Sequence, residues 1–249
     1  MISLGPRRRA GSARTARSPR RLLDDVATFR LAGSDDPALN LLPRHVGAAV
    51  TVVATRGSLH GLAAVAQDGA DGAAAHLRHH SGVYNAPFAR AVLRGRSPTL
   101  IHLWRREQGL LLPAGNPRTI TDIRHVQHLR IGKRSPGTGT RVLLDQALTD
   151  AGLAPDELAG PELGSHLEVA LAVAAGAVHT GLAVRAAAVD LDLEFLSVAR
   201  EDFDLVLPAT AIGAAAPLVA ALHDPTIRDA VTALGGYDLS RAGTVDRLD

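Results

Sequence analysis

One local pattern recurs along this chain and constrains its fold: a short apolar run, a turn rich in Gly, Ser or Thr, and then a segment with helical periodicity. The clearest copy is the turn Arg134-Ser135-Pro136-Gly137-Thr138-Gly139-Thr140-Arg141, which lies between the apolar runs 129–132 and 142–144. Gly137 and Gly139 let backbone N–H groups point toward one place, and Thr138 and Thr140 add hydroxyls at the positive end of a helix dipole. The turn therefore suits an anion, and a simple Thr-capped helix start is the alternative.

Three further turns follow the same pattern: Gly33-Ser34-Asp35-Asp36-Pro37, Arg56-Gly57-Ser58 and Ser165-His166. This alternation predicts an α/β protein with mostly parallel sheets covered by helices. In such sheets a ligand binds beyond the carboxyl ends of the strands, so the turns at 34, 58, 138 and 166 are expected to meet at one cleft. Strands are expected at 28–32, 50–54, 73–77, 100–103, 109–112, 129–132, 182–184 and 203–207, with helices opening at 33–37 and covering 59–67, 141–151 and 167–175.

The chain is long enough for two lobes, since 249 residues with 46% hydrophobic content can bury a sizeable core. A proline- and glycine-rich break at 113–117 indicates a crossing between the lobes. We expect lobe 1 to comprise residues 28–113 and 204–249 and lobe 2 to comprise residues 114–203. Residues 1–27 are expected to be a basic, disordered tail or a mis-assigned start.

Charge is distributed unevenly, because residues 1–21 carry seven arginines and no acidic residue, which leaves 20 basic against 25 acidic residues in the rest. Such a tail is suited to a protein partner or to weak, nonspecific contact with nucleic acid. We expect no secretory signal and no membrane contact, because Leu22-Leu23 runs straight into Asp24-Asp25 and no apolar run reaches about 18 residues. We therefore expect a cytoplasmic protein. Since the chain has no cysteine, thiolate chemistry is excluded.

Six short segments carry a family resemblance: Gly33-Ser34-Asp35-Asp36-Pro37-Ala38-Leu39, Tyr84-Asn85-Ala86-Pro87-Phe88, Arg106-Glu107-Gln108-Gly109-Leu110, the turn at 136–144, His166, and Leu234-Gly235-Gly236-Tyr237-Asp238. Together they resemble the periplasmic-binding-protein-like substrate-binding domain of bacterial helix-turn-helix regulators and of molybdopterin-biosynthesis fusions. More distantly, the order of turns is similar to that of the molybdate-binding proteins of ABC transporters, which have the type II two-lobed fold. The resemblance covers about residues 28–245 and implies ligand binding by lobe closure, without catalysis.

The resemblance also implies a ligand and a set of ligand-binding residues. The implied ligand is a small anion such as molybdate, tungstate or a molybdopterin-related compound, with a regulatory role for the protein. The alternative is an accessory factor or enzyme of molybdenum cofactor biosynthesis. The ligand-binding candidates are Ser34, Asp35, Ser58, Tyr84, Asn85, Arg106, Gly137, Thr138, Gly139, Thr140 and His166.

Two of these assignments have a structural alternative. Arg106 suits an oxyanion through its bidentate geometry. The alternative is that the segment 105–108 is a solvated strand end with an Arg/Glu pair. Tyr84 and Asn85 either line the cleft or cover a loop. The chain also departs from the family pattern at His179-Thr180-Gly181-Leu182-Ala183, where Asp-x-Gly-x-Gly is expected, and at Phe203, where Tyr is expected. These departures leave the identity of the ligand open.

Other chemistries have weaker support in the sequence. The histidines at 76, 79, 80, 125 and 128 match no zinc signature and are expected to be solvated loop residues, so no metal or cofactor is expected. No Gly-x-Ser-x-Gly elbow is present, and Asp35-Asp36 is expected to cap a helix, so no catalytic residue is expected. His166 with Glu168 is the one candidate acid–base pair, and two residues apart on a helix they are expected to face different ways. About 27 residues precede the binding domain, from which we expect no helix-turn-helix reading of DNA.

Overall fold

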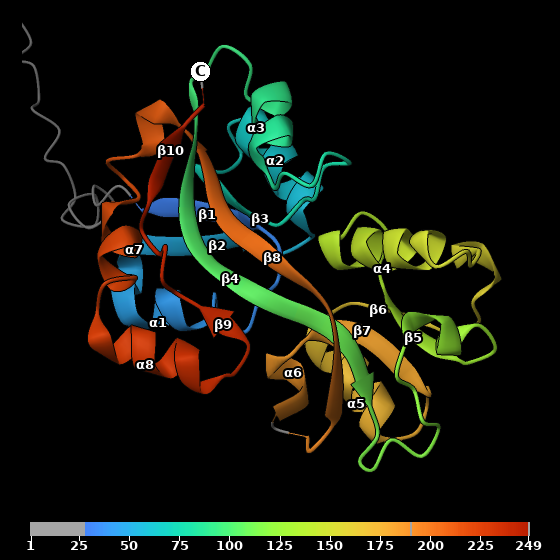
Figure 1. Ribbon diagram of the computed structural model, residues 1–249. Coiled ribbons are helices and arrows are strands. Elements are labelled where there is room, and N and C mark those ends of the chain that lie inside the picture. Colours follow the sequence, from blue (N-terminus) through green and yellow to red (C-terminus); the bar gives the residue numbers. More distant parts are fainter. Residues whose placement is uncertain (1–27, 190, 249) are drawn as a thin grey trace, which may run out of the picture.

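The computed structural model describes residues 28–189 and 191–248 (Figure 1), so the predicted basic tail at 1–27 lies outside the described residues. The strands are β1 (Phe29–Gly33), β2 (Val50–Ala54), β3 (Gly72–Ala75), β4 (Pro98–Leu112), β5 (Ile131–Arg134), β6 (Glu162–Leu163), β7 (Thr180–Val184), β8 (Glu194–Pro208), β9 (Tyr237–Asp238) and β10 (Val245–Arg247). The helices are α1 (Leu41–Val46), α2 (Ser58–Ala66), α3 (Ala86–Val92), α4 (Gly139–Asp150), α5 (His166–Ala174), α6 (Ala186–Val189), α7 (Ala216–Ala221) and α8 (Pro225–Ala233).

The described strands form one curled sheet of ten strands, in the order β2-β1-β3-β8-β4-β7-β5-β6, with β9 and β10 paired to β4. Strands joined through helices pair in parallel, namely β1 with β2 and β3, and β5 with β6 and β7. The long strand β4 is antiparallel to β7, β8, β9 and β10, and β3 is antiparallel to β8. The pairing is therefore mixed, which corrects the expectation of mostly parallel sheets.

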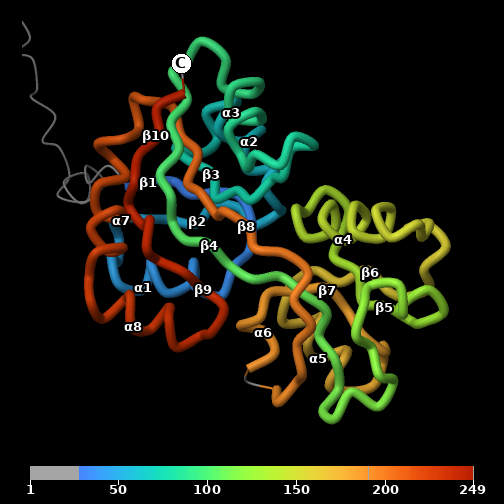
Figure 2. The backbone as a smooth tube through the Cα atoms, viewed as in Figure 1, coloured from blue at the N-terminus to red at the C-terminus, as the bar shows by residue number. Residues whose placement is uncertain are grey.

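Two lobes form at the ends of this sheet, and β4 and β8 run side by side through both of them (Figure 2). Ile101, Leu103 and Trp104 of β4 belong to the hydrophobic core of the first lobe, which also contains β1, α1, α7 and α8. Further along the same strand, Leu110 and Leu112 pack in the core under α4 in the second lobe. The lobe boundaries predicted at 113 and 203 stay predictions, but the crossing strand has entered the second core before residue 113.

The two 15-residue strands replace shorter predicted ones. Strand β4 joins the segments 100–103 and 109–112 through Trp104 and four polar residues, and β8 extends the predicted 203–207 by nine residues at its start. Helix α1 also begins later than predicted, at Leu41, because the loop before it is held by Asp36, whose Oδ1 accepts the backbone N–H groups of Ala38 (2.8 Å) and Leu39 (3.2 Å). Asp36 thus holds a turn and does not cap the helix, contrary to the prediction from the sequence.

The helices that follow the predicted turns begin where polar caps allow. The Thr138 hydroxyl accepts the N–H of Arg141 at the start of α4, and that of Ser165 accepts the N–H of Glu168 at the start of α5. Helix α2 packs tightly on the end of β1, because a Cβ at Gly61 would lie 2.4 Å from the Cα of Gly33. Within residues 28–189 and 191–248, no helix is both long and apolar enough to span a bilayer.

Candidate ligand-binding cleft

A cluster of buried polar side chains lies where β4 and β8 pass from one lobe to the other. Charged residues are rarely buried this completely unless they are paired or bind something. The cluster is called here the cleft cluster, and each member is at most 4% exposed: Ser34, Asp36, Ser58, His76, Arg106, Gln108, Arg134, His166 and Glu201. Its members come from both lobes and from both crossing strands.

Arg106 lies at the centre of the cleft cluster. Its Nη1 donates to Asp36, its Nε lies 3.5 Å from Oε2 of Glu201, and its guanidinium carbon is 4.5 Å from the centre of the Phe203 ring. Burial by itself lowers the pKa of Arg106, but the charges of Asp36 and Glu201 outweigh that effect and raise it. Arg106 is therefore a permanently charged group held by two carboxylates.

Glu201 connects Arg106 to two further buried side chains. The Nδ1 atom of His76 lies 3.0 Å from Oε2 of Glu201, and Nε2 of Gln108 donates to the same oxygen. Burial raises the pKa of Glu201, but His76 and Arg106 outweigh it, so the net pKa is lowered and the side chain is ionised. Burial lowers the pKa of His76, and the Glu201 carboxylate opposes this shift without cancelling it.

Arg134 is the second buried arginine, and it has much weaker compensation than Arg106. Its Nη2 donates to the carbonyl oxygen of Gly164 (2.9 Å), and its Nη1 lies 3.8 Å from Oδ2 of Asp35, which belongs to the other lobe. Burial, more than any neighbour, lowers the pKa of Arg134. Arg134 is a cation for which the protein itself supplies little countercharge.

His166 opens helix α5 and is buried among basic groups. The backbone N–H of Val184 is 3.4 Å from its Nδ1, so Nδ1 is the acceptor and the ring is neutral. Burial is the largest cause of a pKa well below the ordinary value, and Arg134, Arg106 and His76 lower it further. The charges that act on His166 thus come from both lobes.

Hydroxyls and helix N-termini complete the cleft. The side-chain oxygens of Ser34 and Ser58 are 2.7 Å apart, and Ser58 Oγ also accepts the N–H of His76 (3.2 Å). A Cβ at Gly57 would lie 3.2 Å from the carbonyl oxygen of Gly137 and 3.3 Å from the Cα of Thr138. The loop before α2 in one lobe thus touches the loop before α4 in the other, and the positive ends of these helices adjoin.

Donors outnumber acceptors among the unsatisfied groups of the cluster. Within the described residues, Nη2 of Arg106 and Nε of Arg134 are buried without a hydrogen-bond partner. The carboxylates of Asp36 and Glu201 already accept several donors, including the Tyr237 hydroxyl at 3.2 Å from Oδ1 of Asp36. Oε1 of Gln108 is a buried acceptor without a partner. Such a cleft can hold a ligand that mainly accepts hydrogen bonds.

The structure brings most of the residues predicted from the sequence to this cleft. Its members include Ser34, Ser58, Arg106 and His166, with Thr138 and Gly139 at the adjoining helix start and Asp35 at the edge beside Arg134. Gly137 lies in the loop that meets Gly57, and Thr140 is buried in the first turn of α4. Their roles in ligand binding stay predictions.

Tyr84 and Asn85 lie apart from the cleft cluster. Asn85 is fully buried, its Oδ1 accepts the N–H of Leu77 (2.7 Å), and its Nδ2 donates to Oδ2 of Asp204 (2.7 Å) and to the carbonyl oxygen of Ala75 (3.1 Å). This amide ties the end of β3 to β8, so its hydrogen-bonding capacity is already used. Tyr84 is half-buried and lines a cavity together with Arg200 and with Leu143 of α4.

Five members of the cleft cluster were not predicted as site residues: Asp36, His76, Gln108, Arg134 and Glu201. His76 is 2% exposed, so the expectation of a solvated loop histidine is wrong for this residue. His125 and His128 are exposed, as predicted. Arg134 was recoverable from its place at the end of a strand before the anion-binding turn. Among the described residues, no group of three His, Asp or Glu side chains has the arrangement of a metal site.

The pair His166 and Glu168 is separated in the way that helical geometry predicts. His166 is buried, whereas Glu168 is exposed and its Oε2 accepts the N–H of Gly164 at 2.8 Å. Glu168 thus belongs to the cap of α5, and the two side chains share no ligand position.

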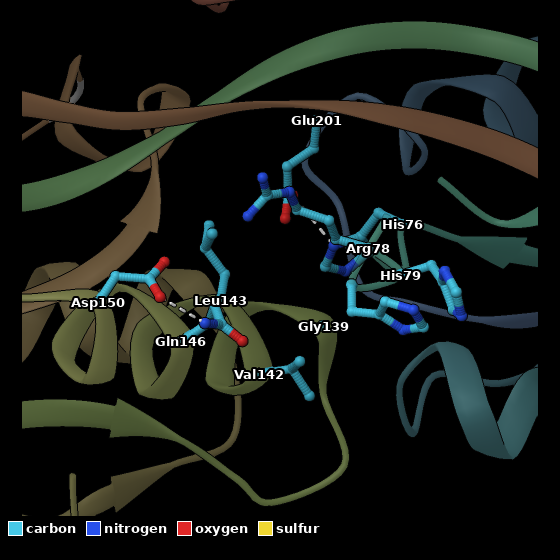
Figure 3. A pocket seen from close by; sticks show the side chains of 10 residues that line it. His76, Arg78, His79, Gly139, Val142, Leu143, Gln146, Asp150 and Glu201 are labelled. Carbon is cyan, nitrogen blue, oxygen red and sulfur yellow. Dashed lines mark hydrogen bonds and ion pairs between the residues drawn. The ribbon is translucent and has the colours of Figure 1, made fainter. Parts of the chain in front are cut away.

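A cavity of about 260 Å³ adjoins the cleft on the side of α4 (Figure 3). His76, Gly139 and Glu201 line its inner end. Figure 3 shows Arg78 and His79 on one wall and Val142, Leu143 and Gln146 of α4 on the other.

A curled sheet with two lobes and a polar cleft at the crossing strands defines a binding protein of the periplasmic type. Residues 39–223 match the family described as PBP superfamily domain, and the chain belongs to this family. An uncharacterized protein of Bacillus subtilis (strain 168), YvgK, is 29% identical over 185 residues, which are 71% of this chain. The match spans 60% of the length of the Bacillus protein.

Solved structures show the same fold. The sulfate-binding protein SubI from Mycobacterium tuberculosis H37Rv aligns with a TM-score of 0.61 at 15% identity, covering 86% of each chain. A putative phosphate ABC transporter substrate-binding protein from Clostridium perfringens, with bound phosphate, aligns with a TM-score of 0.63 at 12% identity, covering 85% of this chain and 99% of its own. At these identities the likeness concerns the fold.

Proposed function

We propose that the protein binds a small oxyanion in the cleft between its lobes and releases it chemically unchanged. The observation that carries the proposal is the pair of buried guanidinium groups whose Nη2 (Arg106) and Nε (Arg134) have no acceptor in the described structure. Unsatisfied buried donors cost free energy, and an oxyanion between them supplies the missing acceptors. The sulfate and phosphate named for the two structural neighbours belong to the same ligand class.

A cationic or zwitterionic ligand fits the cleft less well. Binding an ammonium group requires a free carboxylate, but Asp36 accepts from Arg106, Tyr237 and two backbone N–H groups. Glu201 is likewise shared by His76, Arg106 and Gln108. The groups that remain for a ligand are donors, with Gln108 Oε1 as the buried exception.

The same contacts argue for binding without catalysis. A general base needs a free lone pair toward the reacting atom, and the buried carboxylates are engaged by charged or amide donors. The Nδ1 lone pair of His166 faces the N–H of Val184. The cleft thus resembles a preorganised binding site more than an acid–base centre.

Within this class we propose molybdate or tungstate as the first candidates, with a regulatory role through ligand-driven closure. A fully ionised oxyanion needs only donors, whereas hydrogen phosphate also carries a proton that needs an acceptor. Because Gln108 Oε1 is available for one such proton, phosphate is the direct competitor. The lobe contact at Gly57 and Gly137 is the element through which occupancy would reach a protein partner.

The test is calorimetric titration of the full chain with molybdate, tungstate, sulfate and phosphate. We expect one ion to bind and the variant Arg134→Met to weaken it at least about 100-fold, a loss of about 2.7 kcal/mol. The exposed Arg118 is the matched control, and Arg118→Met should bind as the parent does. If none of the four ions binds, or if Arg134→Met binds as tightly as the parent, the proposal is wrong.

A further inference from the structure

The cavity beside α4 is larger than the cleft cluster requires for a small ion. It has a volume of about 260 Å³, whereas one water molecule occupies about 30 Å³ of liquid. A tetrahedral inorganic oxyanion is only a few waters in size. The cavity therefore has room for a part of a ligand that an inorganic ion does not possess.

The cavity remains open although the lobes already touch. Gly57 meets Gly137 and Thr138 on one side of the helix start, and the cavity lies on the other side, beyond Gly139. Its inner end is lined by His76 and Glu201, which belong to the cleft cluster. A ligand that reaches His76 and Glu201 can thus extend into the cavity without separating the lobes.

The space continues along α4 toward the surface. A second cavity of about 360 Å³ is lined by Tyr84 and Arg200. It shares Arg78, Leu143, Gln146 and Asp150 with the first cavity. The two cavities form one groove between α4 and the segment that follows β3, called here the α4 groove.

The lining of the α4 groove differs from that of the cleft cluster. It offers both acceptors and donors: Asp150, which accepts from Nε2 of Gln146 at 2.7 Å (Figure 3), lies with Arg78, His79 and Arg200 in the lining. Leu143 adds apolar surface. A neutral organic group that bears hydroxyls or amines can use both the acceptors (Asp150 and the amide oxygen of Gln146) and the donors (Arg78 and Arg200) of this lining.

We propose that the cleft also takes an organic phosphate monoester or a close analogue, with its oxyanion among the buried donors and its hydroxyl- or amine-bearing body in the α4 groove. This inference rests on the proposed oxyanion function and adds the class of molecule that carries the anion. Gln146 on α4 forms the outer wall against which that body packs.

The test compares inorganic phosphate, glycerol 3-phosphate, glucose 6-phosphate and AMP by calorimetry on the full chain. At least one ester should bind 10-fold or more tightly than inorganic phosphate. The variant Gln146→Trp fills the groove from an exposed helix position and should remove that advantage, while the affinity for inorganic phosphate changes less than about 3-fold. Val142→Phe, at a second exposed lining position, is the alternative if Gln146→Trp does not fold.

The control is Gln67→Trp at the far end of α2, which lies outside the groove and should change no affinity. If inorganic ions bind but no ester binds more tightly, the groove proposal is overturned and the oxyanion function stands. If an ester binds tightly and both groove variants leave its advantage intact, the placement in the groove is wrong. If neither ions nor esters bind, the oxyanion function itself fails.

Discussion

Arg106 and Arg134 are both buried, but the protein compensates them very differently. Arg106 is held by Asp36 and Glu201, whereas Arg134 has a carbonyl oxygen and a distant carboxylate. Removing one member of a buried ion pair leaves the other charges unpaired, which costs about 3–5 kcal/mol. Removing Arg134 leaves no closely paired carboxylate without its partner. A substitution of Arg106 should therefore lower mainly the stability of the fold, and a substitution of Arg134 should lower mainly the affinity for the ligand.

We predict that Arg106→Met lowers the free energy of unfolding by about 3–5 kcal/mol and that Arg134→Met lowers it by less than about 1 kcal/mol. Urea denaturation of the ligand-free protein measures both values. Equal losses in the two variants would contradict the assignment of Arg106 as the paired arginine. Arg118→Met, at an exposed position, is the control and should change little.

His166 gives a pH dependence whose sign follows from its burial. Its folded pKa lies well below the ordinary value, so below about pH 6.5 the unfolded chain binds a proton that the folded protein does not. Stability is thus complete above the unfolded pKa and decreases as the pH falls. We expect His166→Gln to reduce the slope of unfolding free energy between pH 5 and 7, by at most about 1.4 kcal/mol per pH unit.

Denaturation at pH 5, 6 and 7 measures that slope. The exposed His128 provides the comparison, and His128→Gln should keep the parental slope. An unchanged slope in His166→Gln would show that this ring does not stay neutral in the folded protein.

At the scale of elements, the loops before the helices were largely predictable, whereas the crossing strands were not. Turn chemistry is local, so a glycine followed by a hydroxyl residue identified the positions at 34, 58, 138 and 165 without tertiary information. Strand β4 carries Arg105 to Gln108 in its middle, and an apolar pattern cannot show that Arg106 and Gln108 are buried there. Glu201 and His76 were not predicted as site residues for the same reason: the local sequence pattern does not show that these polar side chains are buried.

Helix α4 contacts the first lobe through its first residue. A Cβ at Gly139 would lie 2.4 Å from Cε1 of His76, whose ring is held by Glu201. Alanine favours a helix by about 1 kcal/mol over glycine, so Gly139→Ala should not lower the stability of α4 itself. We expect this variant to keep the lobes apart and to weaken ligand binding at least about 10-fold.

Calorimetry together with small-angle scattering checks this prediction, since a cleft held open increases the radius of gyration. Gly213→Ala is the matched control, because a Cβ at Gly213 has no heavy atom within 4 Å. Unchanged affinity in Gly139→Ala would mean that His76 moves aside without affecting closure.

For the whole molecule, the continuous sheet makes the two lobes one folding unit. Strand β4 contributes Trp104 to one core and Leu110 to the other, and β8 pairs with it along its length. Unfolding of either lobe would remove strand pairing from the other. We therefore predict one cooperative thermal transition, with equal calorimetric and van't Hoff enthalpies. Two separate transitions in scanning calorimetry would show that the lobes unfold independently.

The alternation within β4 also limits how the chain can change in evolution. Arg106 and Gln108 are buried toward the cleft, whereas Arg105 is exposed and Glu107 pairs with Arg185 on the other face. Because neighbouring strand residues point to opposite faces, inserting one residue before Arg106 would exchange these faces. Insertions and deletions in this segment are thus tolerable only in pairs, so homologues that keep the cleft should change the spacing between Trp104 and Leu110 only by even numbers of residues.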